Sequence, residues 1–168
     1  MAEETTGNGP DTQPAAAPAA QPQQLVINAQ YIKDLSFENP RAPQSLGQQQ
    51  AQPSVEIKVD VKAQSLGAEN YEVVLTINAS AKVQEDALFI VELIYGAIVT
   101  VRNVPPELLS AAVLVETPRL MFPFARNIVA ETTRDGGFPP LMINPIDFGD
   151  LLRRNMAAAT EITDSPPA

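Results

Sequence analysis

Apolar and charged residues alternate through much of the first half of the chain. Between Val55 and Val61 every second residue is apolar, and the residues between them are charged. After a turn at Gly67 the alternation resumes and continues from Tyr71 to Val83. A period of two places successive side chains on opposite faces of a strand, so each segment is predicted to be a half-buried strand with one wet face. The short connection between them predicts antiparallel pairing.

A further strand is predicted to begin at Tyr31 and to be stopped by Pro40 and Pro43. By parity, one face carries Tyr31, Lys33, Leu35 and Phe37, and the other carries Ile32, Asp34, Ser36 and Glu38. The carboxylates of Asp34 and Glu38 are therefore expected to project from the same face. A mostly polar face that ends in paired acids is typical of an exposed docking surface.

The segment Leu88–Val101 differs because both of its parities are apolar, with Glu92 as its single charge. Fully extended it would span about 45 Å, which is long for a strand in a chain of this size. We expect one apolar face to meet another subunit, because the helices that follow can cover only one face of the sheet. The alternative is a central strand covered by helices of its own chain.

The second half of the chain is predicted to be helical. Pro105-Pro106 opens a short helix, and Thr117-Pro118 has the form of an N-cap followed by proline at the first position of a longer one. Gly136-Gly137 is expected to end this longer helix. Its broad apolar stripe consists of Leu120, Met121, Phe124, Ala125, Ile128 and Val129. Asn144-Pro145 opens a third helix, which carries Phe148.

The two ends of the chain differ in composition from its middle. Residues 1–24 are rich in Pro, Ala and Gln and contain too few large apolar side chains to offset chain entropy, so they are predicted to be a disordered tail. Residues 157–168 are small and weakly acidic and are predicted to be a flexible tail. Residues 25–156 then form a single folded domain.

Composition restricts the chemistry of the chain. Its 168 residues contain neither Cys nor His, which excludes disulfides, the usual zinc and haem ligands, and triads that depend on His or Cys. No cofactor motif, P-loop or metal site is predicted. An enzyme that uses Asp34, Glu38 or Glu92 as acid and base is the catalytic alternative.

Charge and hydropathy restrict its partners and location. The formal net charge of −9 argues against nucleic acid, because phosphate binding needs a basic face, and favours a basic protein partner. Residues 1–24 lack the positive start and apolar run of a signal peptide, and the longest apolar stretch is too short for a membrane helix. The protein is expected to be cytoplasmic, with no direct membrane insertion.

Four segments resemble, in order, the bacterial protein-export chaperone family SecB. They are Tyr31–Pro43, Asn70–Leu75, Met121–Arg126 and Gly137–Asp147. The resemblance implies an α+β protomer with a four-stranded antiparallel sheet, helices packed on one face, and assembly as a dimer of dimers. Residues 25–156 would be the chaperone domain.

The resemblance also implies a docking site for the export ATPase SecA. In the family, the sheet positions that match Asp34, Glu38, Ile90 and Glu92 contact SecA. All four have even parity here, which fits one exposed face. Glu92 among apolar neighbours favours exposure, because a charge buried without a partner is costly. The alternative interpretation is a set of ordinary solvated charges.

Further positions are implied in assembly and client binding. Subunit contacts would fall on Phe89, Val91, Leu93, Leu120, Phe124 and Ile128, with plain core packing as the alternative for the strand residues. A groove for unfolded clients would be lined by Phe138, Leu141, Met142 and Phe148, and Met suits varied apolar partners because it adapts its shape. A connector that simply packs over the core is the alternative.

The function implied by the resemblance is that of an ATP-independent holdase. It would form a homotetramer, keep precursor proteins unfolded and deliver them to SecA, without a cofactor and without catalysis. A general interaction or anti-aggregation protein without an export role is the alternative.

Overall fold

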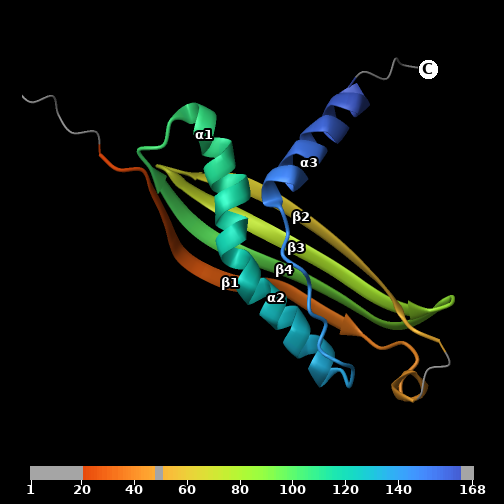
Figure 1. Ribbon diagram of the computed structural model, residues 1–168. Helices are drawn as coiled ribbons and strands as arrows, with labels where there is room; N and C mark the ends of the chain where they lie inside the picture. The colour runs from red at the N-terminus through yellow and green to blue at the C-terminus, as the bar shows by residue number, and fades with distance from the viewer. Residues whose placement is uncertain (1–20, 48–50, 164–168) are drawn as a thin grey trace, which may run out of the picture.

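The fold is described here from a computed structural model, which covers residues 21–47 and 51–163, with side chains as far as Ala158. Four strands form one antiparallel sheet, in the order β1-β4-β3-β2 (Figure 1). They are β1 (Gln24–Glu38), β2 (Ser54–Gly67), β3 (Asn70–Val83) and β4 (Asp86–Arg102). The predicted N-terminal tail lies outside the described residues up to residue 20, and β1 begins at Gln24.

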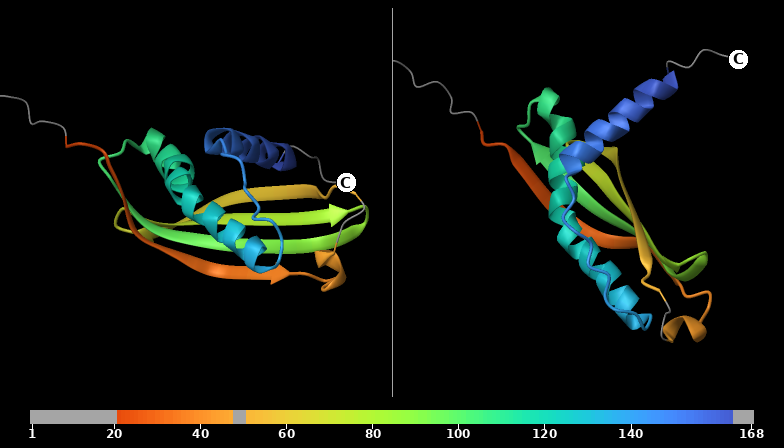
Figure 2. Two further views of the ribbon diagram at one scale, coloured as in Figure 1. Left: turned by 60° about the horizontal axis from the view of Figure 1, so that its bottom comes forward. Right: turned by 45° about the vertical axis from the view of Figure 1, so that its right-hand side comes forward.

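The helices lie on one face of this sheet and leave the other face uncovered (Figure 2). They are α1 (Pro106–Ala111), α2 (Thr117–Asp135) and α3 (Phe148–Thr163), and a π-helical turn, η2 (Ala112–Glu116), joins the first two. The predicted α+β protomer, with a four-stranded antiparallel sheet and helices on one face, is thereby confirmed. The third helix runs to Thr163, past the domain boundary predicted at residue 156.

The prediction that Thr117 caps a new helix is wrong. Thr117 has helical dihedral angles, and its hydroxyl donates to the backbone carbonyl of Ala112 at 3.0 Å. The wider π turn lets the chain pass Pro118, which has no N–H to donate, without ending the helix. One helical rod therefore runs from Pro106 to Asp135.

This rod has the length and composition of a membrane span. Its apolar stripe instead packs on the sheet, where Met121, Ala125 and Val129 are fully buried. Beneath them lie the odd-numbered residues of the two central strands, Val73, Leu75, Ile77, Val91, Leu93, Ala97 and Val99, all without exposed surface. The rod is thus a core helix of the protomer, as an amphipathic stripe on a half-buried sheet requires.

The predicted parity of β1 is correct only in part. A register shift between Ile32 and Asp34 places Lys33 in a bulge, so that Tyr31 pairs with Gly96 and Ile32 pairs with Tyr95. An extra residue reverses the alternation on either side of a bulge. Tyr31 therefore lies on the uncovered face with Asp34, and Ile32 lies on the helix-covered face.

Candidate functional site

The uncovered face of the sheet carries the predicted acidic positions together. Glu38 pairs with Ile90 across β1 and β4, Ser36 pairs with Glu92, and Asp34 pairs with Ile94. Directly paired residues project to the same face, so Asp34, Glu38, Ile90 and Glu92 share one surface. Ile90, which lies opposite Glu38 at one end of this group, is 40% exposed. The structure therefore brings all four predicted docking residues onto one face, and we call them the acidic patch.

Ion pairing distinguishes the acidic patch from the other acids on this face. Glu56, Asp60 and Glu72 have lysine partners, Lys58, Lys62 and Lys33, at 3.1, 3.8 and 2.8 Å. Asp34, Glu38 and Glu92 have no ion pair among the described residues. The patch is thus a region of uncompensated negative charge with an apolar side chain, Ile90, at one end, which suits a basic partner.

A polar network borders the acidic patch. The hydroxyl of Tyr31 donates to Oε1 of Glu72 at 2.5 Å, and Nζ of Lys33 donates to the same oxygen at 2.8 Å. The hydrogen bonds from Lys33 and then Tyr31 lower the pKa of the Glu72 carboxyl. The hydrogen bond to Glu72, followed by burial, raises the pKa of Tyr31 to about 12. Sequence reasoning missed Glu72, although its even parity in the segment Asn70–Leu75 could have placed it on this face.

The connector between α2 and α3 is fixed at its start by aromatic packing. The ring of Phe138 lies 5.0 Å from that of Phe89 and 6.4 Å from that of Phe37. Farther along, the backbone N–H of Leu141 donates to the hydroxyl of Thr133 at 2.9 Å. Met142 is 58% exposed. Of the predicted groove residues in the connector, Phe138 and Leu141 are partly buried anchors, and Met142 presents free apolar surface.

Phe148, also predicted to line the client groove, is buried in the core of the protomer. It is 1% exposed, and its ring meets that of Phe122 edge-on at 5.9 Å. The start of α3 is pinned onto α2 through this contact, because an edge-to-face pair adds to the burial of two large rings. Phe148 is therefore a core residue.

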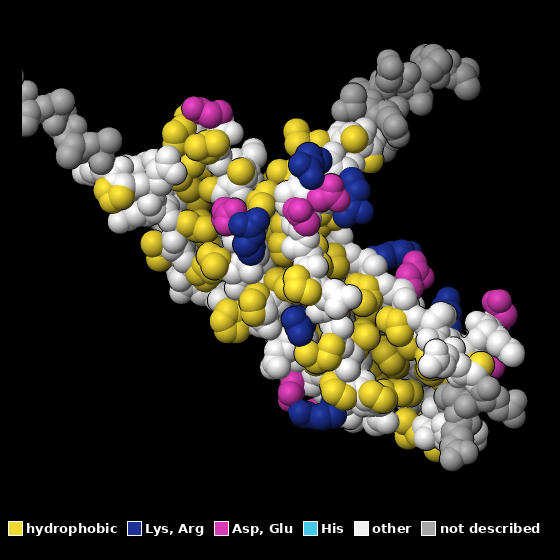
Figure 3. Space-filling model, viewed as in Figure 1, with side chains coloured by type: hydrophobic (Ala, Val, Ile, Leu, Met, Phe, Trp, Pro, Cys, Tyr) yellow, Lys and Arg dark blue, Asp and Glu magenta, His cyan; other side chains and the backbone are white. Residues whose placement is uncertain are grey.

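A groove does exist beside the connector, on the side of β2. It has a volume of about 490 Å³ and is lined by Ile57, Lys58, Val59, Ile143, Asn144, Pro145, Ile146, Leu151 and Arg154. We call it the connector groove. Val55 and Ile57 of β2 are 48% and 37% exposed beside it. On the helix-bearing face of the sheet, Figure 3 shows apolar side chains gathered beside the connector, in a region that no helix covers. The alternation in β2 predicted its apolar face, but sequence reasoning assigned that face to the core.

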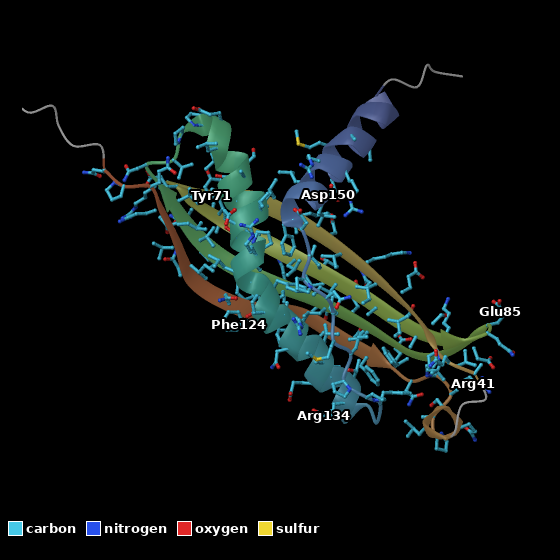
Figure 4. All side chains as sticks on the ribbon, in the orientation of Figure 1. Arg41, Tyr71, Glu85, Phe124, Arg134 and Asp150 are labelled. Carbon is cyan, nitrogen blue, oxygen red and sulfur yellow. The ribbon has the colours of Figure 1, made fainter. Side chains whose placement is uncertain are left out.

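The six predicted subunit contacts divide into two groups. Phe89, Val91 and Leu93 are at most 5% exposed and lie in the protomer's own core, which favours the core-packing alternative for these strand residues. On α2, Leu120 and Phe124 are 49% and 55% exposed, and Ile128 is partly buried. Phe124 lies on the side of α2 nearest β1 (Figure 4). This second group is accessible to another subunit.

The described residues contain no cluster of three or more His, Cys, Asp or Glu side chains that could hold a metal ion. The features found are an acidic patch, an apolar groove and an exposed apolar row on a helix.

Comparison with known proteins shows the family of the chain. The family described as preprotein translocase subunit SecB matches residues 18–159. The chain belongs to the SecB family. Proteins named protein-export protein SecB are 52% identical over 151 residues in Afipia carboxidovorans (90% of this chain, 94% of the relative) and 48% identical over 161 residues in Parvibaculum lavamentivorans (96% and 95%). The predicted family resemblance is thereby confirmed, and these findings support an export-chaperone role.

A solved structure supports the SecB fold. The SecB-like chaperone of Mycobacterium tuberculosis, solved in complex with a peptide from an antitoxin, superposes with a TM-score of 0.60. The match covers 73% of this chain and 90% of the chaperone, at 14% sequence identity. At that identity the likeness concerns the fold alone.

Proposed function

We propose that this SecB-family chain is an ATP-independent holdase that captures unfolded precursor proteins in the connector groove. The observation that carries the proposal is an apolar groove along a sheet edge in a chain of this family. The side chains of Ile57 and Ile146 supply apolar contact, and β2 is an edge strand whose outer backbone groups have no strand partner. An extended client could add to this edge, with backbone hydrogen bonds supplying affinity and apolar side chains entering the groove.

Low sequence specificity follows from this arrangement. Backbone hydrogen bonds are available to any extended segment, and a folded protein offers none at its buried strands. Exposed Met142 adds a side chain that adapts to different partners. Slow-folding precursors expose apolar segments for longest, so they would be the clients captured.

The acidic patch is proposed to dock SecA. Its carboxylates have no ion pair within the described residues, and Ile90 beside Glu38 offers exposed apolar surface. This surface lies on the opposite face of the sheet from the connector groove, so the chain could hold a client and its acceptor at once. Charges at such a rim would mainly set the rate and salt dependence of docking.

Assembly into a dimer of dimers is proposed to use the exposed row of α2. Leu120, Phe124 and Ile128 project from the helix layer, and two of them are about half exposed. Covering such a row in an oligomer removes apolar surface from water. The proposed setting is the cytoplasm, and no catalytic role is proposed for any residue.

The test is aggregation of an unfolded precursor with and without the chain, in the presence and absence of ATP, followed by SecA binding. A holdase suppresses aggregation equally with and without nucleotide and binds the folded client far more weakly. Suppression without any SecA binding would favour the anti-aggregation alternative. Suppression that requires nucleotide would contradict the proposal.

A further inference from the structure

Almost every basic side chain of this acidic protein has a carboxylate partner. All Lys and Arg residues lie in the described part of the chain, and only Lys82 and Arg126 have no ion pair there. Lys82 is exposed next to the turn between β3 and β4, where water solvates its ammonium group. Arg126 differs because it is partly buried on α2.

The surroundings of Arg126 form a small, half-apolar site. A cavity of about 290 Å³ is lined by Pro123, Arg126, Asn127, Ala130 and Met142. Ala130 is 7% exposed, so one wall of the cavity is formed by a buried apolar residue. A guanidinium has five N–H donors in a planar fork and is usually paired with carboxylates when it is partly desolvated. Arg126 has none of these partners among the described residues.

Carboxylates are in excess elsewhere on the surface. Asp34, Glu38, Glu85, Glu92 and Glu107 have no ion pair within the described residues, and the net charge is −9. A second copy of the chain therefore brings acids to a surface that holds an unpaired base. On the same helix, Leu120 and Phe124 present apolar surface that also requires a cover.

We infer that Arg126 is an inter-subunit anchor, whose guanidinium receives a carboxylate from a second copy of this chain packed on α2. The cavity beside Met142 is then complete only in the assembled protein. This inference rests on the proposed assembly. It adds the residue that would make subunit association depend on charge and salt. A charge-assisted, bidentate pair at this place would fix the orientation of the second copy as well as add affinity.

The experiment compares Arg126→Gln with Lys82→Gln, which removes the other unpaired base and changes the net charge equally. Sedimentation equilibrium of the full chain is measured at about 50 mM and about 500 mM NaCl, where screening lengths differ severalfold. Arg126→Gln is expected to raise the subunit dissociation constant about tenfold or more at low salt, and by less at high salt, because a pair with a charged group is worth about 1.5–3 kcal/mol. Arg126→Lys should fall between, since lysine cannot donate as a fork.

Three results separate the possibilities, provided that circular dichroism shows each variant folded. If Arg126→Gln assembles as tightly as Lys82→Gln at low salt, the inference is overturned while the proposed assembly stands. If Arg126→Gln loses client capture but assembles normally, the guanidinium serves clients and the inference is again overturned. If the unmodified chain sediments as a monomer, the proposed assembly itself fails, and the inference fails with it.

Discussion

The phenol ring of Tyr31 lies directly over Gly96 on the uncovered face of the sheet. A Cβ atom added at Gly96 would come within 2.6 Å of Cζ of Tyr31, closer than such atoms can approach. The bulge at Lys33 turns Tyr31 toward this position, and the glycine leaves room for the ring to cross β4 and reach Glu72 on β3. Gly96 therefore accommodates the ring of a residue on the neighbouring strand.

This contact predicts that the effect of a substitution at Gly96 on stability depends strongly on which residue occupies position 31. Gly96→Ala should destabilise the protein by about 1–3 kcal/mol, because the ring of Tyr31 must leave a packed position. In a Tyr31→Ala background the same change should be neutral or stabilising, because alanine restricts the unfolded chain more than glycine does. Urea unfolding of the four proteins of this cycle, at one protomer concentration, measures the coupling. Additive effects would show that the ring does not occupy the space over Gly96.

The hydrogen bonds to Glu72 predict a pH dependence of stability. The folded pKa of Glu72 lies below its ordinary value of 4.5, so the carboxylate contributes stability that is fully present above that pH. This contribution is lost as pH falls through the lower folded pKa. Glu72→Gln should therefore lose less stability than the unmodified chain between neutral pH and pH values below 4.5. Parallel unfolding curves against pH for the two proteins would contradict this.

Much of the fold could be predicted from periodicity, because burial of one face imposes an alternation that a sequence displays. The strands from Val55 to Val83 and the helix stripe at Met121 are of this kind. The bulge at Lys33 could not be predicted. With or without the extra residue, each face of β1 carries a mixture of apolar and polar side chains, so the sequence does not show the change of register. The unbroken helix through Thr117 was also missed, because a π turn makes its N-cap signature misleading.

The exposure of site residues could be predicted where the alternation along a strand decides it. It could not be predicted where the packing of another element over the residue decides it. Asp34, Glu38 and Glu92 share a parity, and that face is bare in the structure. Ile57 and Phe148 are both apolar, yet the first is 37% exposed beside the connector groove and the second is buried. Their different exposure results from tertiary packing alone, because the hydrophobicity of a residue does not show whether a helix packs over it.

The buried position of Phe148 leads to a prediction about stability. Phe148→Ala should destabilise the protein by about 3–5 kcal/mol, since it removes a fully buried ring that packs against Phe122. Phe148→Leu should cost less because it retains most of the buried volume. Chemical denaturation measures both. If Phe148→Ala unfolds like the unmodified chain but captures clients poorly, the residue belongs to a groove after all.

The connector groove predicts which apolar substitutions weaken client capture. Replacing Ile57 by Ser should reduce affinity for an unfolded precursor severalfold, because an exposed apolar contact that lines the groove is removed without cost to the core. Leu66→Ser is the control, since Leu66 is also half exposed on β2 but does not line the groove. Fluorescence anisotropy with a labelled precursor measures the binding of both variants and of the unmodified chain. Equal losses in the control would place capture elsewhere.

The acidic patch predicts a charge-dependent interaction with SecA. Reversing Asp34 and Glu38 to Lys should weaken SecA binding and flatten its dependence on salt, because both carboxylates lack an ion pair among the described residues and lie on the same bare face as exposed Ile90. Client capture should be unchanged, since the groove lies on the other face of the sheet. Binding is measured by titration calorimetry or surface plasmon resonance at several salt concentrations.

The chain offers a matched control for this reversal. Glu85 and Glu107 are also unpaired in the described structure, but one lies in the turn before β4 and the other in the first turn of α1. Changing both to Lys alters the net charge by the same amount as the reversal of Asp34 and Glu38. If both double variants weaken SecA binding equally, the effect reflects overall charge, and the patch has no specific role. If only the variant with Asp34 and Glu38 reversed loses affinity and salt dependence, the docking surface is this end of β1 and β4.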